Sequence, residues 1–472
     1  MSEMKKILIA GGGITGLTAA YYLQKEITEK DLPYEVKLVE AGSRLGGKIK
    51  TVRRNGFVIE QGPDSFLSRK QPAVKLTDEL GLRNQIVRNG TGQSFILAGD
   101  KLHKMPKGSF MGIPKQIRPF LFSGLVSPAG KLRAGMDFVL PRSKQGDQSL
   151  GSFFRRRFGN QLVENLIEPL LSGIYAGNID DMSIMATFPN FYELEQEHRS
   201  LIKGLRETKP EQPKRKKNKN KDEKKQGMFY SFQNGLETLV EQLEETLGDV
   251  VERNAAVDHV EKKDHGYHVL LSNGDVYKAD AVIMTTPHHT LPKVFSQFDI
   301  FDRFQEMPST SVANVAMAFD ESAITQDIDG TGFVVSRNSD YRITACTWTH
   351  KKWPNAAPEG KALVRCYVGK PDDQTVVNLS DEEITDIVLN DLNKTMNITQ
   401  KPEFSVISRW TNAMPQYTVG HTERLANVRK SMHKELPGVF IAGSSYEGVG
   451  IPDCIGQGEQ AVADVLQFLE KK

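Results

Sequence analysis

The sequence predicts an α/β fold that opens with a Rossmann-like unit, in which parallel strands alternate with helices. Residues 7–10 (ILIA) and 36–39 (VKLV) are short and largely apolar, as expected of strands buried on both faces of a parallel sheet. Residues 11–16 (GGGITG) follow the first run directly and fit G-x-G-x-x-G at the start of a helical segment. The order strand, glycine turn, helix, strand is that of a dinucleotide-binding unit.

The composition indicates a globular protein with more than one core. The chain has 472 residues, a length that corresponds to roughly two to four domains. Basic and acidic residues number 61 and 59, and this balance argues against nucleic-acid binding by the molecule as a whole. Further apolar runs at 281–284 and 439–442 predict more buried strands, whereas residues 71–206 are expected to be mostly helical.

The cysteines and the N-terminus predict a reduced, cytoplasmic protein. Cys346, Cys366 and Cys454 are odd in number, widely separated and without metal-ligand spacing, so we expect neither a disulfide nor a metal site. Residues 1–6 lead straight into the first strand without a signal peptide. No apolar run approaches the about 18 residues that span a bilayer. Peripheral contact with the cell membrane stays open.

Each glycine of the first motif has its own role in binding a diphosphate. Gly11 permits the tight turn, Gly13 lets the backbone approach the pyrophosphate, and Gly16 lets helix and strand pack closely. The free N–H groups and the dipole at the helix start favour phosphate. Glu40 ends the second strand, 24 residues after Gly16, where its carboxylate can accept hydrogen bonds from ribose hydroxyls. A glycine-rich turn without a ligand is the alternative.

A second motif indicates which dinucleotide is bound. Residues 40–47 (EAGSRLGG) fit E-x-x-x-R-x-G-G, which resembles the second nucleotide signature of the superfamily of flavin amine oxidases and protoporphyrinogen oxidases. The resemblance implies FAD, with Arg44 near its pyrophosphate and with Gly46 and Gly47 approaching the flavin side. A surface Arg44 beside a flexible turn is the structural alternative.

The same resemblance assigns cofactor contacts to distant parts of the chain. Residues 62–65 (GPDS) resemble the flavin-facing loop, and the segment 443–452 resembles the one that meets the isoalloxazine and ribityl chain. Val257 matches an adenine-side backbone contact. Trp410 matches an aromatic residue near the flavin, although a core position explains it equally well. The expected FAD contacts are Gly11, Gly12, Gly13, Ile14, Thr15, Gly16, Glu40, Ala41, Arg44, Gly46, Gly47, Lys48, Gly62, Pro63, Asp64, Ser65, Val257, Trp410, Ser444, Val449, Gly450 and Ile451.

Longer segments resemble one branch of that superfamily. Residues 148–177 (QSLGSFFRRRFGNQLVENLIEPLLSGIYAG) and 446–455 (YEGVGIPDCI) are similar to the porphyrinogen oxidases of the haem pathway, specifically the soluble enzymes of Gram-positive bacteria. The likeness runs nearly end to end. It implies oxygen-dependent oxidation of coproporphyrinogen III to coproporphyrin III, release of hydrogen peroxide, and hand-over of the product to the next haem-pathway enzyme. Protoporphyrinogen IX, the substrate of mitochondrial and plastid relatives, stays open as the alternative.

The resemblance also implies the full fold class. We expect a Rossmann-like FAD-binding domain of the p-hydroxybenzoate hydroxylase or amine oxidase type, a mixed α+β substrate domain and a helical insertion domain. The expected division is an FAD-binding domain at 1–70, 228–306 and 416–472, a substrate domain at 71–100 and 307–415, a helical, membrane-association-like domain at 101–206, and a disordered lysine-rich loop at 207–227. The loop offers almost no apolar side chain to bury. A basic arm for anionic lipid or a protein partner is the alternative.

The implied chemistry requires no catalytic acid or base from the protein. The flavin accepts hydride, and the aromaticity gained by the product drives the later steps. No catalytic residue is therefore expected, and His288-His289 after a turn is interpreted as a solvated pair.

The implied substrate predicts a flat apolar pocket with cations at its rim for propionates. Lys70 is the leading candidate for a rim cation, with its neighbour Arg69, and Ile174 and Tyr367 are candidate walls. Surface side chains explain Lys70 and Arg69 equally well, and a plain core role competes for Ile174 and Tyr367.

Residues 105–126 suggest contact with a membrane surface. Lys107, Lys115 and Arg118 accompany several aromatic and aliphatic residues there, and an apolar face with basic flanks is typical of a membrane interface. In the relatives this helical region is the membrane-associating domain. Packing of the same residues into a soluble core is an equally good explanation.

Two rival functions use the same scaffold. The first is an oxidase of the superfamily that acts on amines or carotenoids, which predicts an aromatic cage around the flavin and no cations for propionates. The second is a flavin-free carrier, like the GDP-dissociation inhibitors that bind prenylated GTPases, which would not require intact segments at 40–47 and 443–452. The colour of the purified protein separates these classes, because only a flavoprotein is yellow.

Overall fold

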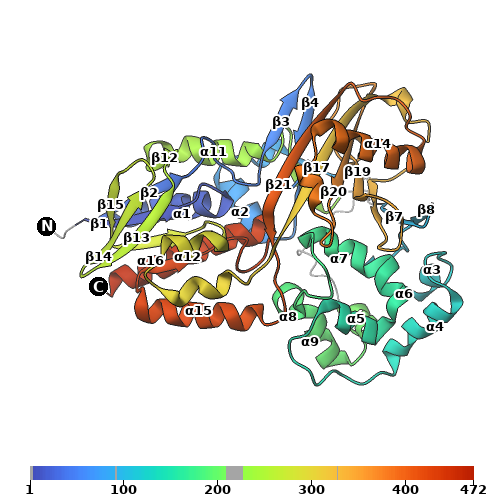
Figure 1. The fold of residues 1–472 in the computed structure, drawn as a ribbon, viewed down its shortest axis with the longest axis horizontal. Helices are drawn as coiled ribbons and strands as arrows, with labels where there is room; N and C mark the ends of the chain where they lie inside the picture. The colour runs from blue at the N-terminus through green and yellow to red at the C-terminus, as the bar shows by residue number, and fades with distance from the viewer. Residues whose placement is uncertain (1–3, 91–92, 209–226, 327, 472) are drawn as a thin grey trace, which may run out of the picture.

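A parallel sheet of five strands lies at the centre of the dinucleotide-binding part of the molecule (Figure 1). The computed structural model describes residues 4–90, 93–208, 227–326 and 328–471. The strands lie in the order β12 (Val251–Arg253), β2 (Tyr34–Glu40), β1 (Lys5–Ala10), β16 (Ala281–Met284) and β22 (Val439–Ile441), all pairing in parallel. The sheet thus joins strands from both ends of the sequence, and strands are present at all four predicted runs.

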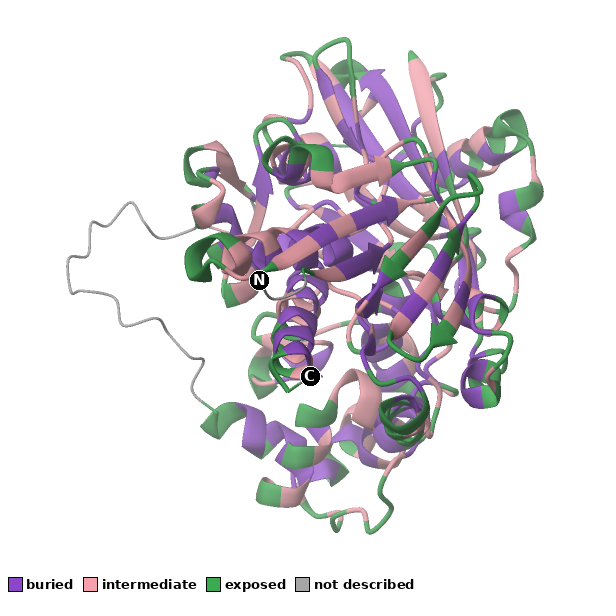
Figure 2. Ribbon diagram, turned by 90° about the vertical axis from the view of Figure 1, so that its left-hand side faces the viewer, coloured by how far each residue is buried: buried purple, intermediate pink, exposed green. Residues whose placement is uncertain are grey.

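Alternate side chains of β1 enter two different cores. Ile7 and Ile9 belong to one buried cluster, whereas Leu8 and Ala10 belong to another, because successive strand residues point to opposite faces of a sheet. The covering helices are α1 (Ile14–Lys30), α11 (Glu237–Leu247) and α16 (Ile451–Glu470) on one face and α15 (His421–Glu435) on the other. Figure 2 shows buried residues concentrated in strands and along the inner sides of helices. The continuous apolar sequence of β1 therefore matches a strand buried on both faces.

A second sheet, of seven strands, lies beside the parallel one (Figure 1). Its order is β21 (Phe404–Pro415), β17 (Ser309–Asp320), β20 (Lys361–Val368), β19 (Ile343–Trp348), β18 (Gly332–Val335), β7 (Phe95–Ala98) and β8 (Lys101–Lys104). The prediction of mostly helical structure is wrong for residues 86–114, where five short strands occur, β7 and β8 among them. A four-residue apolar run does not distinguish strand from helix. Residues 95–98 form the strand β7 because they pair in parallel with β18, where Phe95 lies opposite Phe333.

A helical region packs below the second sheet (Figure 1). Its helices are α3 (Ile117–Leu121), α4 (Pro128–Gly135), α5 (Leu150–Phe158), α6 (Asn160–Leu162), α7 (Glu168–Tyr175), α8 (Ile184–Thr187), α9 (Pro189–His198) and α10 (Leu201–Glu207). They share one apolar core. Within the described residues, no helix is both long enough and apolar enough to cross a membrane. The predicted lysine-rich loop lies outside the described residues except at positions 207, 208 and 227.

A buried cluster of charges holds this helical region together. The Arg157 guanidinium lies 2.8 Å from the Asp137 carboxylate and 3.4 Å from that of Glu195, and all three side chains are fully buried. Asp137 also accepts hydrogen bonds from the Ser200 hydroxyl and from the backbone N–H of Ile202. Desolvating three charges is costly, so the arrangement is stable only while every partner is present.

Glu195→Ala should therefore destabilise the protein far more than Glu193→Ala on the same helix. The first change leaves Arg157 with half of its countercharge in a dry site, an effect of about 3–5 kcal/mol in the free energy of unfolding. Glu193 is exposed, and its loss should change that free energy by less than about 0.5 kcal/mol. Urea unfolding of the two variants measures the difference, and equal losses would show that the buried cluster is not stabilising.

Candidate functional site

The glycine turn after β1 has the geometry of a phosphate-binding turn. Gly11 has a φ of +107°, and its N–H donates to the Val39 carbonyl at 2.8 Å, which closes the turn against β2. A Cβ at Gly16 would collide with the Gly11 carbonyl oxygen, so only glycine lets α1 approach the strand here. A Cβ at Gly13 would meet no atom within 4 Å. Gly13 therefore borders open space at the start of α1, where the helix N–H groups favour an anion.

The carboxylate of Glu40 is fixed at the end of β2. Its Oε2 accepts from the Gly12 N–H at 2.7 Å, and its Oε1 accepts from the Gly42 N–H at 2.8 Å. Each oxygen keeps a further lone pair that can accept from a ribose hydroxyl. The Glu40 carbonyl accepts from the Ala255 N–H, and this bond brings the strand that begins at Val257 to the same sheet edge.

The Arg44 side chain forms hydrogen bonds with the loop that carries it. Its guanidinium donates to the carbonyl oxygens of Leu45, Gly47 and Ile49, and it lies 3.8 Å from the Glu237 carboxylate. These bonds hold the loop of the second motif in shape. The loop in turn lies against the glycine turn, because the N–H of Gly46 donates to the Gly12 carbonyl at 2.8 Å and Gly13 and Gly46 form an isolated parallel bridge.

The loop 62–65 is clamped to the second sheet by buried charges. The Asp64 carboxylate lies 2.7 Å from the Lys352 ammonium and 3.4 Å from the Arg365 guanidinium. Burial alone would raise the pKa of Asp64, but the two cations outweigh it and hold that pKa well below its usual range. Trp410 Nε1 donates to the Gln61 carbonyl at 2.7 Å, so the predicted aromatic residue packs against this loop. Sequence reasoning missed Lys352 and Arg365, although a buried aspartate requires cations.

Glu60 is the carboxyl group near this loop that titrates closest to neutrality. Burial raises the pKa of Glu60 to about 7, against the lowering effect of its hydrogen bonds. Its carboxylate accepts from the Leu236 N–H at 2.6 Å and from the Thr51 hydroxyl at 2.8 Å. The first bond joins β4 (Phe57–Glu60) to the segment that opens α11, and the second joins it to the neighbouring strand, which begins at Thr51. These contacts hold the carboxyl group in place between β4 and its neighbours.

The C-terminal segment returns to the N-terminal motifs. Gly450 precedes α16 as its N-cap, and the Ser444 carbonyl accepts from the Tyr417 hydroxyl at 2.7 Å. The Lys48 ammonium lies 3.2 Å from the Ser444 hydroxyl. Lys48 follows the paired glycines of the second motif, so the two ends of the chain meet at one place.

The interpretation of His288-His289 as a solvated pair is wrong for His288. This side chain is 2% exposed, its Nδ1 lies 3.2 Å from the Ser445 hydroxyl, and its Nε2 lies 3.0 Å from the Met307 carbonyl. Burial lowers the pKa of His288 to about 4, so the ring is neutral at pH 7. His289 is exposed, as expected. A turn followed by polar residues does not reveal that tertiary partners will bury one of them.

The predicted substrate residues lie on separate elements. Lys70 precedes α2 (Gln71–Glu79) and forms a 2.5 Å ion pair with Asp453 of α16, while Arg69 is exposed. Ile174 lies on α7 and is 40% exposed. Tyr367 lies on β20, and its hydroxyl accepts a hydrogen bond from the Arg365 guanidinium. The buried cluster around Asp64 therefore also fixes the orientation of Tyr367.

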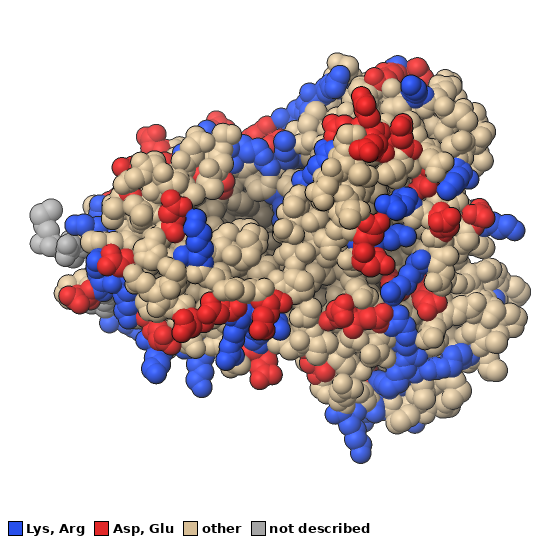
Figure 3. Space-filling model, in the orientation of Figure 1, with Lys and Arg blue, Asp and Glu red and all other residues tan. Residues whose placement is uncertain are grey.

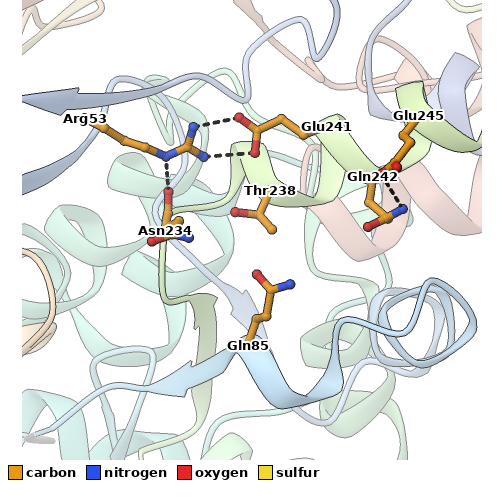
Figure 4. Close-up of a pocket in the computed structure, with 7 residues that line it drawn as sticks. All are labelled: Arg53, Gln85, Asn234, Thr238, Glu241, Gln242 and Glu245. Atoms are coloured by element: carbon orange, nitrogen blue, oxygen red, sulfur yellow. Dashed lines mark hydrogen bonds and ion pairs between the residues drawn. The ribbon is translucent and has the colours of Figure 1, made fainter.

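A polar pocket lies apart from these motifs, between β3 (Thr51–Arg54) and α11 (Figure 4). Its volume is about 470 Å³, and Arg53 donates to both carboxylate oxygens of Glu241 within it. That bidentate pair neutralises the arginine of the pocket. Figure 3 shows the surface hollowed between the dinucleotide-binding part and the second sheet. None of the motif residues described above is among the residues that line the pocket on α11.

This fold and site define the class of the protein. A Rossmann-like sheet, two glycine motifs at its strand ends and a returning C-terminal helix are the arrangement of an FAD-dependent oxidoreductase. The residues fit FAD: Gly13 leaves room for a diphosphate, and Glu40 presents acceptors for a ribose. The model of the family described as flavin containing amine oxidoreductase matches residues 14–466, and the chain belongs to that family.

Individual proteins of this class are similar to the chain over nearly its whole length. The coproporphyrinogen III oxidase of Bacillus subtilis is 53% identical over 99% of this chain and 100% of its own length, and that of Staphylococcus aureus is 44% identical over 98% and 100%. A chloroplastic protoporphyrinogen oxidase of Nicotiana tabacum is 26% identical, over 98% and 86%. The crystal structure of a protein assigned as protoporphyrinogen oxidase from Exiguobacterium has a TM-score of 0.86 at 38% identity, covering 99% of each chain.

Gly13→Ala should weaken FAD binding without unfolding the protein, whereas Gly16→Ala should destabilise the fold itself. The methyl group at position 13 enters open space, so the fold should be kept while FAD binding weakens at least about tenfold through lost approach to the diphosphate. The methyl group at position 16 collides with backbone, so that variant should unfold at a lower temperature. Flavin absorbance per protein and circular dichroism measure the two effects. Full flavin content in Gly13→Ala would contradict the assignment of the turn.

Proposed function

We propose that the protein oxidises coproporphyrinogen III to coproporphyrin III in haem biosynthesis, with molecular oxygen as the electron acceptor and hydrogen peroxide as the product. The observation that carries the proposal is the 53% identity to a coproporphyrinogen III oxidase over the full length of both chains. The residues of the cofactor motifs meet at one junction, which supports the same conclusion. Oxidation of protoporphyrinogen IX is the alternative, because a structural relative at 38% identity carries that assignment.

The chain contributes placement and electrostatics to the proposed reaction. When bound, FAD supplies the chemistry by accepting hydride equivalents at N5 and passing electrons to oxygen. The turn at Gly11–Gly16 and the start of α1 hold its diphosphate, and Glu40 holds its ribose. The clamp of Asp64 by Lys352 and Arg365 fixes the loop that we assign to the flavin. The His288 ring is neutral at pH 7 and the Glu60 carboxyl group accepts a hydrogen bond from the Leu236 N–H, and we assign no residue as catalytic acid or base.

The ion pair between Lys70 and Asp453 bears on substrate choice. Coproporphyrinogen has four propionates and protoporphyrinogen has two, so cations at the pocket rim favour the former. Both side chains of the pair are partly exposed, 43% and 35%, and a propionate would have to compete with Asp453 for the ammonium. A partly exposed pair is worth about 0.2–1 kcal/mol. Lys70 should therefore contribute to the preference for coproporphyrinogen III over protoporphyrinogen IX, and oxidation should still occur without it.

Lys70→Ala should lower kcat/KM for coproporphyrinogen III about two- to fivefold and for protoporphyrinogen IX less, so that the preference narrows. Asp453→Asn should raise kcat/KM for coproporphyrinogen III, because it frees the ammonium. Lys75→Ala is the matched control, since Lys75 forms a 2.5 Å pair with Glu459 between the same two helices. Steady-state rates for both substrates at two salt concentrations test this. A wild-type preference for protoporphyrinogen IX would refute the proposed substrate. If Lys70→Ala lowers kcat/KM equally for both substrates and independently of salt, Lys70 does not bind propionates at the rim of the pocket.

We further propose that the helical region touches the surface of the cell membrane, with the protein otherwise in the cytoplasm. The sequence left two explanations open for the segment 105–126, contact with a membrane surface and packing into the core, and each fits part of the segment. Ile113, Phe120, Leu125 and Val126 are buried and Phe110 and Met111 pack against the same core, whereas Ile117, Leu121 and Phe122 are exposed. These three residues and the exposed Leu132, Met136 and Val139, which follow the segment, are here called the apolar patch.

Two contacts fix the elements that carry the apolar patch. Phe122 is 90% exposed and Leu132 is 77% exposed. The Lys131 ammonium donates to the Leu121 carbonyl at 2.7 Å, which joins the end of α3 to α4. Asp137, between Met136 and Val139, belongs to the buried charge cluster described above. Exposed apolar side chains with basic neighbours are suited to the headgroup region of an anionic bilayer.

Replacing Phe122 and Leu132 together by Ser should weaken binding to phosphatidylglycerol vesicles by at least about tenfold, because each buried side chain contributes roughly 1.5–3 kcal/mol. The control is the pair Leu270→Ser and Val276→Ser, which lie opposite each other on the hairpin of β14 (Gly266–Leu271) and β15 (Val276–Ala279) and are 40% and 54% exposed. Vesicle sedimentation measures binding. Equal losses in both double variants, or no binding by the wild type, would contradict a membrane role for the apolar patch.

A further inference from the structure

The loop that follows β22, residues 443–448, lies beside the glycine turn of the first motif and is here called the β22 loop. Because β22 and β1 belong to one parallel sheet, their carboxyl ends are at the same edge. A Cβ at Gly443 would lie 3.5 Å from the hydroxyl oxygen of Thr15, which belongs to the first turn of α1. Ligands of such sheets bind outside the carboxyl ends of the strands. The β22 loop is therefore at the edge where the cofactor binds.

Four consecutive residues of the β22 loop are each held by a side chain from another part of the chain. Three of these side chains belong to α15 or to the turn before it, and the fourth belongs to the segment after β16. The four contacts are Ser444 with Tyr417, Ser445 with His288, Tyr446 with His421 and Glu447 with Arg429. A loop without such contacts has to be ordered when its ligand binds, and that ordering weakens binding.

His288 joins the segments that follow two neighbouring strands. β16 and β22 pair in parallel, so the chain leaves both at the same edge of the sheet. His288 comes four residues after the end of β16, and Ser445 comes four residues after the end of β22. The Ser445 hydroxyl oxygen accepts from the backbone N–H of His288 at 3.1 Å and lies 3.2 Å from its Nδ1. Both side chains are buried, so these contacts form away from water.

The partners of the His288 ring determine which of its nitrogens carries the proton. Nε2 lies 3.0 Å from the Met307 carbonyl, which can only accept, so we assign the hydrogen to Nε2. Burial lowers the pKa of His288 to about 4, so the ring has a single proton at pH 7. Nδ1 then has a free lone pair, and the Ser445 hydroxyl donates to it. The two nitrogens thus serve different neighbours, the β22 loop and the turn before β17.

We propose that His288 is a positioning residue for the cofactor, which fixes Ser445 and thereby holds the β22 loop in the shape that receives FAD. The inference rests on the binding of FAD at this edge of the sheet, as in the proposed function, and does not depend on which porphyrinogen is oxidised. His288 acts through Ser445, whose hydroxyl is bonded twice to the same histidine. A histidine that served the packing of the core alone would act through Met307 instead. Since the two contacts use different nitrogens, they can be removed separately.

The test measures FAD dissociation from the purified holoenzyme by equilibrium dialysis in three variants. His288→Asn places an amide oxygen where Nδ1 lies and can still accept from Ser445, whereas the longer side chain in His288→Gln reaches only the Met307 carbonyl. The dissociation constant should rise about 3- to 10-fold in His288→Gln, the effect of one lost buried hydrogen bond, and stay within about twofold in His288→Asn. His289→Gln is the matched control and should change nothing, because His289 is adjacent and exposed. Equal losses in the Asn and Gln variants, a larger loss in the Asn variant, or no loss in the Gln variant overturns the proposal.

Ser445→Ala removes the same contact from the side of the loop. It should weaken FAD binding at least as much as His288→Gln, because the hydroxyl also accepts from the His288 backbone N–H. In the double variant the loss should be no greater than in Ser445→Ala alone, since two residues that act through one contact are not additive. Additive losses would show that His288 affects FAD independently of the β22 loop, and the proposal would be wrong. FAD binding is measured without substrate, so a failure of the proposed substrate leaves this outcome unchanged.

Discussion

The structure depends on one constraint, the burial of β1 between two parallel neighbours. Because β1 pairs with β2 on one side and β16 on the other, the chain must leave and re-enter the sheet, and the carboxyl ends of all these strands meet at one edge. The glycine turn, Glu40 and the end of β22 lie at that edge for this reason. A nucleotide site in such a sheet lies outside the carboxyl ends of the strands. Segments hundreds of residues apart therefore build a single site.

Buried charges are of two kinds in this molecule: some have an oppositely charged partner in the protein, and Lys48 has none among the described residues. The cluster of Arg157, Asp137 and Glu195 and the clamp on Asp64 contain both signs, so each fixes one packing of its surroundings. Such pairs contribute little net stability, but they make alternative packings costly. Lys48 lacks an opposite charge among the described residues. The first kind of charge orders the protein by itself, whereas the second becomes favourable only when a ligand supplies the anion.

The sequence was sufficient for the parts of the site that local rules govern. A run of apolar residues, a glycine spacing and a carboxylate at a strand end predicted β1, the turn and Glu40, because each needs only its neighbours along the chain. The strand β7 was missed because its identity comes from pairing with β18. The burial of His288 and the cations around Asp64 were missed for the same reason, since their partners come from distant elements. The direction of Arg44 also follows from loop carbonyls whose positions no motif specifies.

The position of a charge also decides which step of the function it can control. Near the junction, the His288 ring is neutral at pH 7 and the Glu60 carboxyl group is hydrogen-bonded to Thr51 and Leu236. The two candidate porphyrinogens differ only at their edges, where ion pairs are exposed to water and weak. Under the proposed function, selectivity between the two porphyrinogens should be modest and sensitive to salt, whereas salt should screen interactions of buried groups with the cofactor much less.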